Sequence, residues 1–254
     1  MIKLLGLPVL ASEHGKHVDN FILYVHWLMG VLFIGWLAYF LYALFRFRQS
    51  KNPRASYAGA QTHASTYLEV LVAAIEGVLL IGLSIPLWAK FADKFPPISE
   101  ATNIRVVAEQ FAWNGVYPGL DGDFGRQDFH LVSSTNEFGW DYTDPKVKDN
   151  FKGNLNEIIV PFGKPVIATI SSKDVIHSFK VNPFRITQDA IPGMAIPIWF
   201  KPTSIGTNLI NCAQLCGNSH YFMKGFFKVV PQADYDKFIA EKSKSAAANA
   251  GGFE

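Results

Sequence analysis

Residues 212–223 read CAQLCGNSHYFM, and they bring two thiols, an imidazole and a thioether into one twelve-residue segment. Cys212 and Cys216 are the only cysteines in the chain. Soft sulfur donors combined with imidazole select copper among the common metals, and zinc is the main competitor. The segment therefore predicts a copper site on a loop.

The number of donors favours two copper ions over one. If both thiolates bridge, they supply four metal bonds, His220 and a second histidine add two, and Met223 and a backbone carbonyl add two more. A mononuclear blue-copper site needs one cysteine and leaves the other thiol unused. A disulfide between Cys212 and Cys216 is the structural alternative, but it explains neither the histidines nor Met223.

The segment DVIHS, residues 174–178, supplies the second histidine at the expected end of a strand. The chain resembles subunit II of haem-copper cytochrome c oxidases in this segment, in QDAIPGM at 188–194, and in the pattern Cys-Ala-x-x-Cys-Gly-x-x-His-x-x-Met. The resemblance covers about residues 20–236. It implies a dinuclear CuA centre that passes one electron at a time and is held by His177, Cys212, Cys216, His220, Met223 and the backbone carbonyl of Gln214.

Two apolar stretches indicate membrane-spanning helices. Phe21–Phe45 and Tyr67–Phe91 both exceed the roughly 20 residues that a helix needs to cross a bilayer. The connection between them carries four basic residues and no acid, which places it in the cytoplasm by the positive-inside rule. We therefore expect an external segment over residues 1–20, a cytoplasmic loop over 46–66 and an external C-terminal domain. In a bacterium this is a two-pass inner-membrane protein with both ends on the periplasmic side.

Beyond the second stretch, the pattern changes to short β-branched and aromatic runs separated by glycine, proline and asparagine. Such runs predict an all-β Greek-key sandwich or barrel over residues 102–236, with the copper ligands on loops at one end. The family implies a cupredoxin fold here, so the predicted fold class is a transmembrane α-helical hairpin followed by a cupredoxin-like domain. Residues 237–254, rich in Lys, Ser, Ala and Gly, are predicted to be a flexible tail, in which a short helix after Pro231 frays into disorder.

The segment 120–150 is acidic and rich in turns, with seven acidic side chains against three basic ones and a formal net charge of −4. It is either a solvated surface loop or a docking surface whose charge speeds the encounter with a basic electron donor. Asp174, beside the first copper histidine, and Asp189 are further candidates for donor docking.

Two departures from the family concern the electron path and a second metal. Many members have His-Gln-Trp-aromatic-Trp, whose first tryptophan receives the electron from cytochrome c, where this chain has EQFAW at 109–113. Phe111 replaces that tryptophan and Trp113 is retained, so both are candidates for the electron path. Gln214 replaces a glutamate that helps to hold magnesium at subunit I, and an amide is a poorer ligand for a hard cation than a carboxylate. We expect copper to bind despite this replacement, because a backbone carbonyl is the same in both residues. The sequence does not decide whether magnesium binds.

Two carboxylates lie in the second apolar stretch. A charged group there raises the free energy of inserting the helix into the membrane by at least about 2.5 kcal/mol. In the resembled family, a glutamate at the position of Glu69 stands at the mouth of a proton path into subunit I, and Pro86 anchors the alignment. Glu76 lies about two turns further along and points the same way, so both acids could line one polar stripe against a partner subunit. The alternative for Glu69 is an interfacial side chain without a proton role.

The resemblance implies a subunit II that takes electrons from a c-type cytochrome at CuA and passes them to haem in subunit I of cytochrome c oxidase. Oxygen reduction and proton translocation belong to subunit I, subunit III is the further expected partner, and no nucleic-acid partner is expected. A quinol-oxidase subunit II is an alternative with the same architecture, but it lacks the copper ligands. A membrane-anchored copper carrier working alone is the other alternative, and it needs one helix and no membrane carboxylate.

Overall fold

The computed structural model describes residues 5–54, 57–59 and 61–250. The chain divides into two compact units. One contains His17–Lys90 and is helical, and the other contains Pro8–Lys16 together with the chain from Phe91 onward and consists mainly of β-strands.

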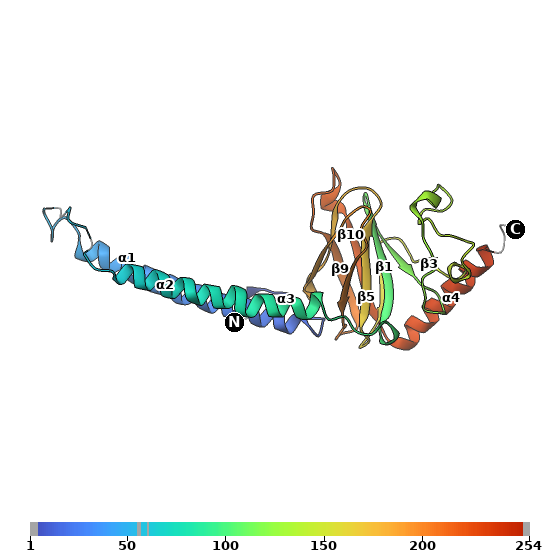
Figure 1. Ribbon diagram of the computed structural model, residues 1–254, viewed down its shortest axis with the longest axis horizontal. Helices are drawn as coiled ribbons and strands as arrows, with labels where there is room; N and C mark the ends of the chain where they lie inside the picture. The colour runs from blue at the N-terminus through green and yellow to red at the C-terminus, as the bar shows by residue number, and fades with distance from the viewer. Residues whose placement is uncertain (1–4, 55–56, 60, 251–254) are drawn as a thin grey trace. The chain divides into compact units, whose positions relative to one another are not determined.

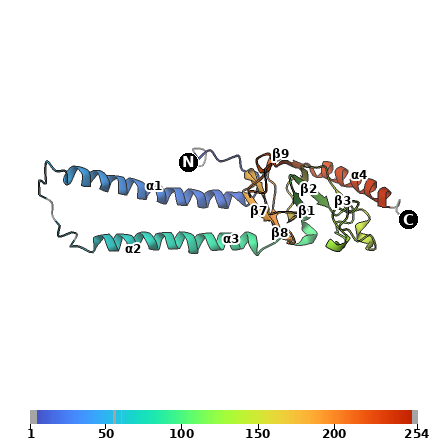
Figure 2. The same cartoon turned by 90° about the horizontal axis from the view of Figure 1, so that it is seen from above.

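Two long helices form the first unit. Helix α1, Gly15–Arg46, contains the predicted stretch 21–45. The second helix is continuous through α2, Ala64–Gly77, the π-helix η2, Val78–Ser84, and α3, Ile85–Ala92. The two helices run antiparallel (Figure 2), and both are long and apolar enough to cross a membrane. The predicted helical hairpin is confirmed, and each helix extends beyond its apolar stretch at both ends.

The π-helix η2 lies directly before Pro86, and the chemistry of proline explains it. In a regular α-helix, Pro86 would leave the carbonyl of Gly82 without its N–H donor and would press its ring against that carbonyl. A wider π turn absorbs such an irregularity. Within the turn, the hydroxyl of Ser84 donates to the carbonyl of Leu80.

The second unit is a sandwich of two sheets (Figure 1). Its strands are β1 Thr102–Glu109, β2 Ala112–Tyr117, β3 Phe151–Lys152, β4 Glu157–Pro161, β5 Val166–Ser172, β6 His177–Val181, β7 Ile186–Ala190, β8 Ile196–Phe200, β9 Gly206–Cys212 and β10 Lys224–Val230. One sheet has the order β3-β2-β1-β5-β8 and the other β4-β10-β9-β6-β7. The connections contain the 3-10 helices η3 Ile98–Glu100, η4 Phe129–Leu131, η5 Pro145–Val147, η6 Asn182–Phe184 and η7 His220–Phe222.

The core lies between the two sheets. Along β1, Ile104, Val106 and Ala108 are buried and the residues between them are partly exposed, which is the alternation of a strand with one inward face. Fully buried rings meet edge to face at the centre, with centroids 5.1 to 6.4 Å apart: Phe179, Phe184, Phe200 and Phe227. Because β8 belongs to one sheet and β6 and β10 to the other, these rings join the two sheets.

Part of the predicted external N-terminal segment belongs to the sandwich. The backbone N–H of Ala11 donates to the carbonyl of Pro183 at 2.8 Å, and its carbonyl accepts from the N–H of Thr203 at 2.9 Å. The buried hydroxyl of Ser12 donates to the carbonyl of Phe184 at 2.7 Å. Residues 8–16 are thus held by the domain that follows the second helix.

The short helix expected after Pro231 is present, but the fraying predicted for residues 237–254 is wrong for the part that the structure describes. Helix α4, Gln232–Ala250, continues through most of it, and residues 251–254 lie outside the described residues. The Lys- and Ala-rich composition that suggested flexibility is also a helix-forming composition, because both residues have high helix propensity.

One face of α4 packs on the sandwich, and this packing explains why the helix is stable. Tyr235 and Ile239 are buried, and the ring of Phe238 lies edge-on to Tyr117 at 5.1 Å and to Phe151 at 5.6 Å. These three helix positions follow the i, i+3, i+4 spacing that places side chains on one face.

The acidic segment 120–150 forms an insertion between β2 and β3 whose carboxylates are used locally. Each of its seven acids accepts at least one hydrogen bond from the protein. Asp144, for example, accepts from the backbone N–H of Arg126 and Lys146, and Glu137 pairs with Lys152 at 2.8 Å. Turn formation therefore accounts for much of the acidic composition.

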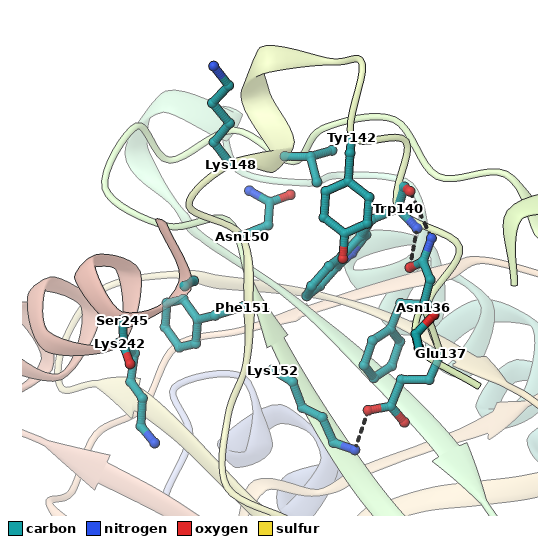
Figure 3. A pocket seen from close by; sticks show the side chains of 14 residues that line it. Asn136, Glu137, Trp140, Tyr142, Lys148, Asn150, Phe151, Lys152, Lys242 and Ser245 are labelled. Atoms are coloured by element: carbon teal, nitrogen blue, oxygen red, sulfur yellow. Dashed lines mark hydrogen bonds and ion pairs between the residues drawn. The ribbon is translucent and has the colours of Figure 1, made fainter. Parts of the chain in front are cut away.

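A pocket of about 360 Å³ lies between this insertion, β3 and α4 (Figure 3). Its walls combine aromatic rings, among them Trp140 and Tyr142, with lysine side chains. Figure 3 shows the ion pair of Lys152 with Glu137 at its edge. None of the lining residues is a predicted copper ligand, so the pocket is separate from the metal site.

Replacing Phe238 by Ala should loosen α4. Because Phe238 is only partly buried, we expect a loss of about 2 kcal/mol, below the roughly 3–5 kcal/mol of a fully buried phenylalanine. The matched control is Lys237→Ala, whose side chain is 75% exposed and should cost less than about 0.5 kcal/mol. Hydrogen–deuterium exchange of the α4 amides in the full chain measures both, and equal protection in the two variants would contradict this packing.

Candidate metal centre

Neighbouring strands of one sheet bring the predicted copper ligands together. Strand β6 begins at His177, β9 ends at Cys212, and β10 begins directly after Met223. Strand β9 lies between β10 and β6 and is antiparallel to both. Figure 1 shows β9 beside β10. The end of β9 and the beginnings of β6 and β10 therefore share one edge of the sandwich.

The loop from β9 to β10 is held at both ends by backbone hydrogen bonds. The N–H of Cys212 donates to the carbonyl of Met223 at 3.3 Å, and the N–H of Ala213 donates to that of Ser178 at 3.0 Å. The helix η7 carries His220 at its first position. The strand ends thus fix where the loop leaves and rejoins the sheet.

The two cysteine sulfurs lie 3.8 Å apart, and both cysteines are free thiols. Metal–thiolate bonds of about 2.3 Å at a tetrahedral angle place two sulfurs about 3.8 Å apart. The spacing therefore fits two thiolates that share an ion, and the disulfide alternative is not the arrangement in this structure.

The other donors surround this sulfur pair. His177 Nδ1 lies 4.0 Å and the carbonyl oxygen of Gln214 lies 3.1 Å from Cys212 Sγ. His220 Nδ1 lies 3.6 Å and Met223 Sδ 3.8 Å from Cys216 Sγ. Within the described residues, the donor atoms of His177, Cys212 and Cys216 all lie within 4.8 Å of one another. The combination of thiolate, imidazole and thioether suits copper better than harder metals.

A carboxylate fixes the orientation of the first histidine. His177 is fully buried, and its Nε2 is hydrogen-bonded to Asp174 Oδ1 at 2.8 Å, which leaves Nδ1 facing the sulfurs. This arrangement of carboxylate, histidine and metal position is common in metal sites. Burial alone raises the pKa of Asp174, but hydrogen bonds from His177 and from the N–H of Gln110 and Val175 hold its pKa below the ordinary value. Asp174 is therefore ionised, and its carboxylate is used to hold His177 in place.

The thiol of Cys216 keeps its proton at neutral pH when no metal is bound. Burial, together with the neighbouring Cys212 thiol, raises the pKa of Cys216 to about 11. A metal ion must displace this proton, because the thiolate is the form that binds metals.

The two aromatic candidates for the electron path occupy different depths. Trp113 is fully buried, with its ring 6.3 Å from that of His177 between centroids. Phe111 is partly exposed in the turn between β1 and β2. It lies against Gly217 in the loop from β9 to β10, residues 213–223, which we name the copper loop after its proposed ligands. Phe111 is thus nearer the surface, and Trp113 lies beneath the site.

The remaining predicted site residues have side chains that are exposed and outside the donor cluster. Asp189 lies at the same edge of the sandwich, on β7 opposite Ser178 of β6, and its side chain is exposed. Glu69 and Glu76 are exposed on α2, where neither has a hydrogen bond or ion pair to the described residues. The side chain of Gln214 is exposed, and its backbone carbonyl is the part that faces a sulfur.

The sequence interpretation missed one residue of this edge. Gln110 contacts both the copper loop and Asp174. The sequence offered one signal for Gln110, which was its place in the EQFAW segment directly before Phe111, a candidate for the electron path.

The chain is similar in sequence to proteins of one family. The family described as cytochrome C oxidase subunit II, periplasmic domain, matches residues 142–230, which include all six proposed ligands. An alternative cytochrome c oxidase subunit 2 of Bradyrhizobium diazoefficiens is 30% identical over 231 residues, 91% of this chain and 82% of that protein. A cytochrome c oxidase subunit 2 of Cereibacter sphaeroides is 28% identical over 236 residues, 85% of this chain and 75% of that protein.

A solved structure is also similar. The crystal structure of the periplasmic domain of subunit II of cytochrome oxidase of Bradyrhizobium japonicum is 27% identical and has a TM-score of 0.44, with 61% of this chain and 100% of that chain covered. The sequence similarity to the Bradyrhizobium diazoefficiens protein spans both apolar helices and the sandwich. The chain therefore belongs to the cytochrome c oxidase subunit II family.

Proposed function

We propose that this chain is the electron-accepting subunit of a haem-copper oxidase and that it holds a dinuclear CuA centre. The observation that carries the proposal is the meeting of six donors at one sandwich edge, around two sulfurs 3.8 Å apart. A c-type cytochrome supplies one electron at a time, and the centre passes it to haem in subunit I. The names of the similar proteins as subunit 2 of cytochrome c oxidase support this role.

The donor set supports two copper ions. Both sulfurs have donors on their outer sides, with imidazole and carbonyl near Cys212 and imidazole and thioether near Cys216. If the thiolates bridge, each of two ions is four-coordinate and no donor is left over. Bridging keeps the ligands in one rigid cluster, so little rearrangement accompanies the loss or gain of an electron.

The helical unit supports a two-pass membrane arrangement. The connection between the helices carries four basic residues and no acid, so we place it in the cytoplasm and both the N-terminal segment and the sandwich in the periplasm. The apolar helix faces are exposed in this chain, which fits contact with lipid and with subunits I and III in the inner membrane.

Glu69 and Glu76 are proposed to face a partner subunit. They lie seven residues apart on α2, so their side chains share a face, and both are exposed. A carboxylate in a membrane helix usually faces protein or water and has a function. We assign Glu69 to proton uptake toward subunit I and Glu76 to the same polar stripe.

The donor is proposed to dock near Phe111, with Asp189 and the charge of segment 120–150 steering its approach. Asp174 contributes less to docking than the sequence suggested, because its carboxylate already accepts four hydrogen bonds from the protein, one of them from His177. Gln214 offers magnesium only a neutral amide, so the proposal does not depend on that metal.

Electron transfer from the donor can be measured directly. Reduced c-type cytochrome mixed with the purified oxidase should reduce the copper centre in a second-order reaction. Raising the salt from about 10 mM to 0.5 M should slow it at least about tenfold, because the Debye length falls well below 10 Å and steering is lost. Stopped-flow absorbance reports the rate. A rate that does not depend on salt would contradict charge steering, and the absence of any reduction would contradict the proposed function.

Glu69→Gln in the same complex separates electron transfer from proton uptake. It should leave the rate of copper reduction unchanged and lower steady-state oxygen consumption, because the carboxylate lies in α2 and not at the copper loop. Unchanged oxygen consumption would refute the proton role of Glu69 and leave the copper proposal intact.

Copper binding should not depend on the side chain of Gln214. Gln214→Ala should retain the full copper content, because the proposed ligand is its backbone oxygen and its side chain is exposed. Cys216→Ser is the comparison variant that should lose copper. It should abolish binding of the two-copper centre, because the proposed bridging sulfur is shared by both ions. Metal analysis of the purified full chains measures both, and loss of copper from Gln214→Ala would show that the amide itself coordinates.

A further inference from the structure

The turn between β1 and β2 reaches across the sandwich to the copper loop. It consists of Gln110 and Phe111, which are joined by a cis peptide bond. Strands β1 and β2 belong to the sheet that carries no copper ligand, whereas β6, β9 and β10 belong to the other. Contacts made by this turn therefore connect the two sheets at the edge where the metal site lies.

Gln110 makes one hydrogen bond to each of the two ligand-bearing segments. Its side-chain Nε2 donates to the backbone carbonyl of Cys216 at 2.6 Å. Its backbone N–H donates to Asp174 Oδ2 at 2.7 Å, and the other oxygen of that carboxylate is bound to His177 Nε2 at 2.8 Å. One residue is thus connected through short hydrogen bonds to a thiolate ligand and to an imidazole ligand.

The residue after Cys216 has to be glycine for this contact to form. A Cβ atom on Gly217 would lie 2.7 Å from Gln110 Nε2 and 3.1 Å from the ring of Phe111. Gly217 also has a φ of +139°, in the range that glycine adopts easily and other residues do not. The loop and the turn are therefore packed as closely as their backbones allow.

We propose that Gln110 is a positioning residue for the copper centre, holding the loop of Cys216 and the Asp174–His177 pair at a fixed separation. The two segments are far apart in sequence, and within the described contacts Gln110 is the residue that hydrogen-bonds to both. Without its amide, the carbonyl of Cys216 loses this donor and the loop can move away from His177. Groups that orient metal ligands in this way typically raise metal affinity about 10- to 100-fold. The inference rests on the proposed copper centre.

The test compares Gln110→Met with the wild-type full chain. Methionine has a similar length and apolar bulk but no amide, so it removes the side-chain hydrogen bond and keeps the backbone N–H to Asp174. Gln110→Asn retains an amide that is one methylene too short to reach the carbonyl. The control is Gln232→Met on α4, an exposed glutamine whose amide bonds to Asp236 away from the site.

Copper release to a competing chelator, the spectrum of the bound copper and the thermal unfolding of the copper-free chain are measured for each variant. We expect Gln110→Met and Gln110→Asn to release copper about 10- to 100-fold faster, with copper-free unfolding unchanged and Gln232→Met like wild type. Release within twofold of wild type in both Gln110 variants would overturn the inference. A wild-type chain that binds no copper pair would instead overturn the proposed function, so the two failures are distinguishable.

Discussion

The structure of the sandwich depends on holding two sulfur atoms, those of Cys212 and Cys216, 3.8 Å apart. Two thiolates about 4 Å apart repel each other by about 4 kcal/mol at the effective dielectric of a protein surface. Burial and the neighbouring Cys212 raise the pKa of Cys216 to about 11, so without a cation this sulfur keeps its proton and the repulsion does not arise. A copper ion at this site would replace the proton, and Cys212 and Cys216 would hold it as thiolates. The domain is therefore organised to bring the sulfurs together and to surround them with further donors.

The position of the two sulfurs is fixed by parts of the sandwich outside the loop that carries them. Three neighbouring strands end or begin at one edge, and the buried phenylalanine rings hold the two sheets in register behind them. Trp113 fills the space under His177, and Asp174 fixes the direction in which that imidazole points. Residues 8–16 and α4 add to the sandwich at positions away from the metal edge. A site held in this way would change little on gaining an electron, as the proposed function requires.

Features governed by local pattern could be predicted from the sequence. Both helices contain their apolar stretches, since a run of apolar residues longer than a bilayer has few other structures open to it. The β-branched run at residues 104–108 predicted a strand and lies in β1, and the proposed donors around Cys212 and Cys216 are close together in the sequence. Helix α4 is longer than the short, fraying helix expected from its polar composition, although Tyr235, Phe238 and Ile239 carry the spacing of a packed face. The bonds of Gln110 join residues more than sixty positions apart, and no local pattern encodes them.

Copper content and electron paramagnetic resonance of the purified full chain test the central claim most directly. If the thiolates bridge two ions, the chain binds two coppers, and its oxidised form has one unpaired electron shared equally between them, with hyperfine splitting from both nuclei. One copper per chain with the four-line pattern of a single nucleus, or zinc bound in place of copper, would contradict the account.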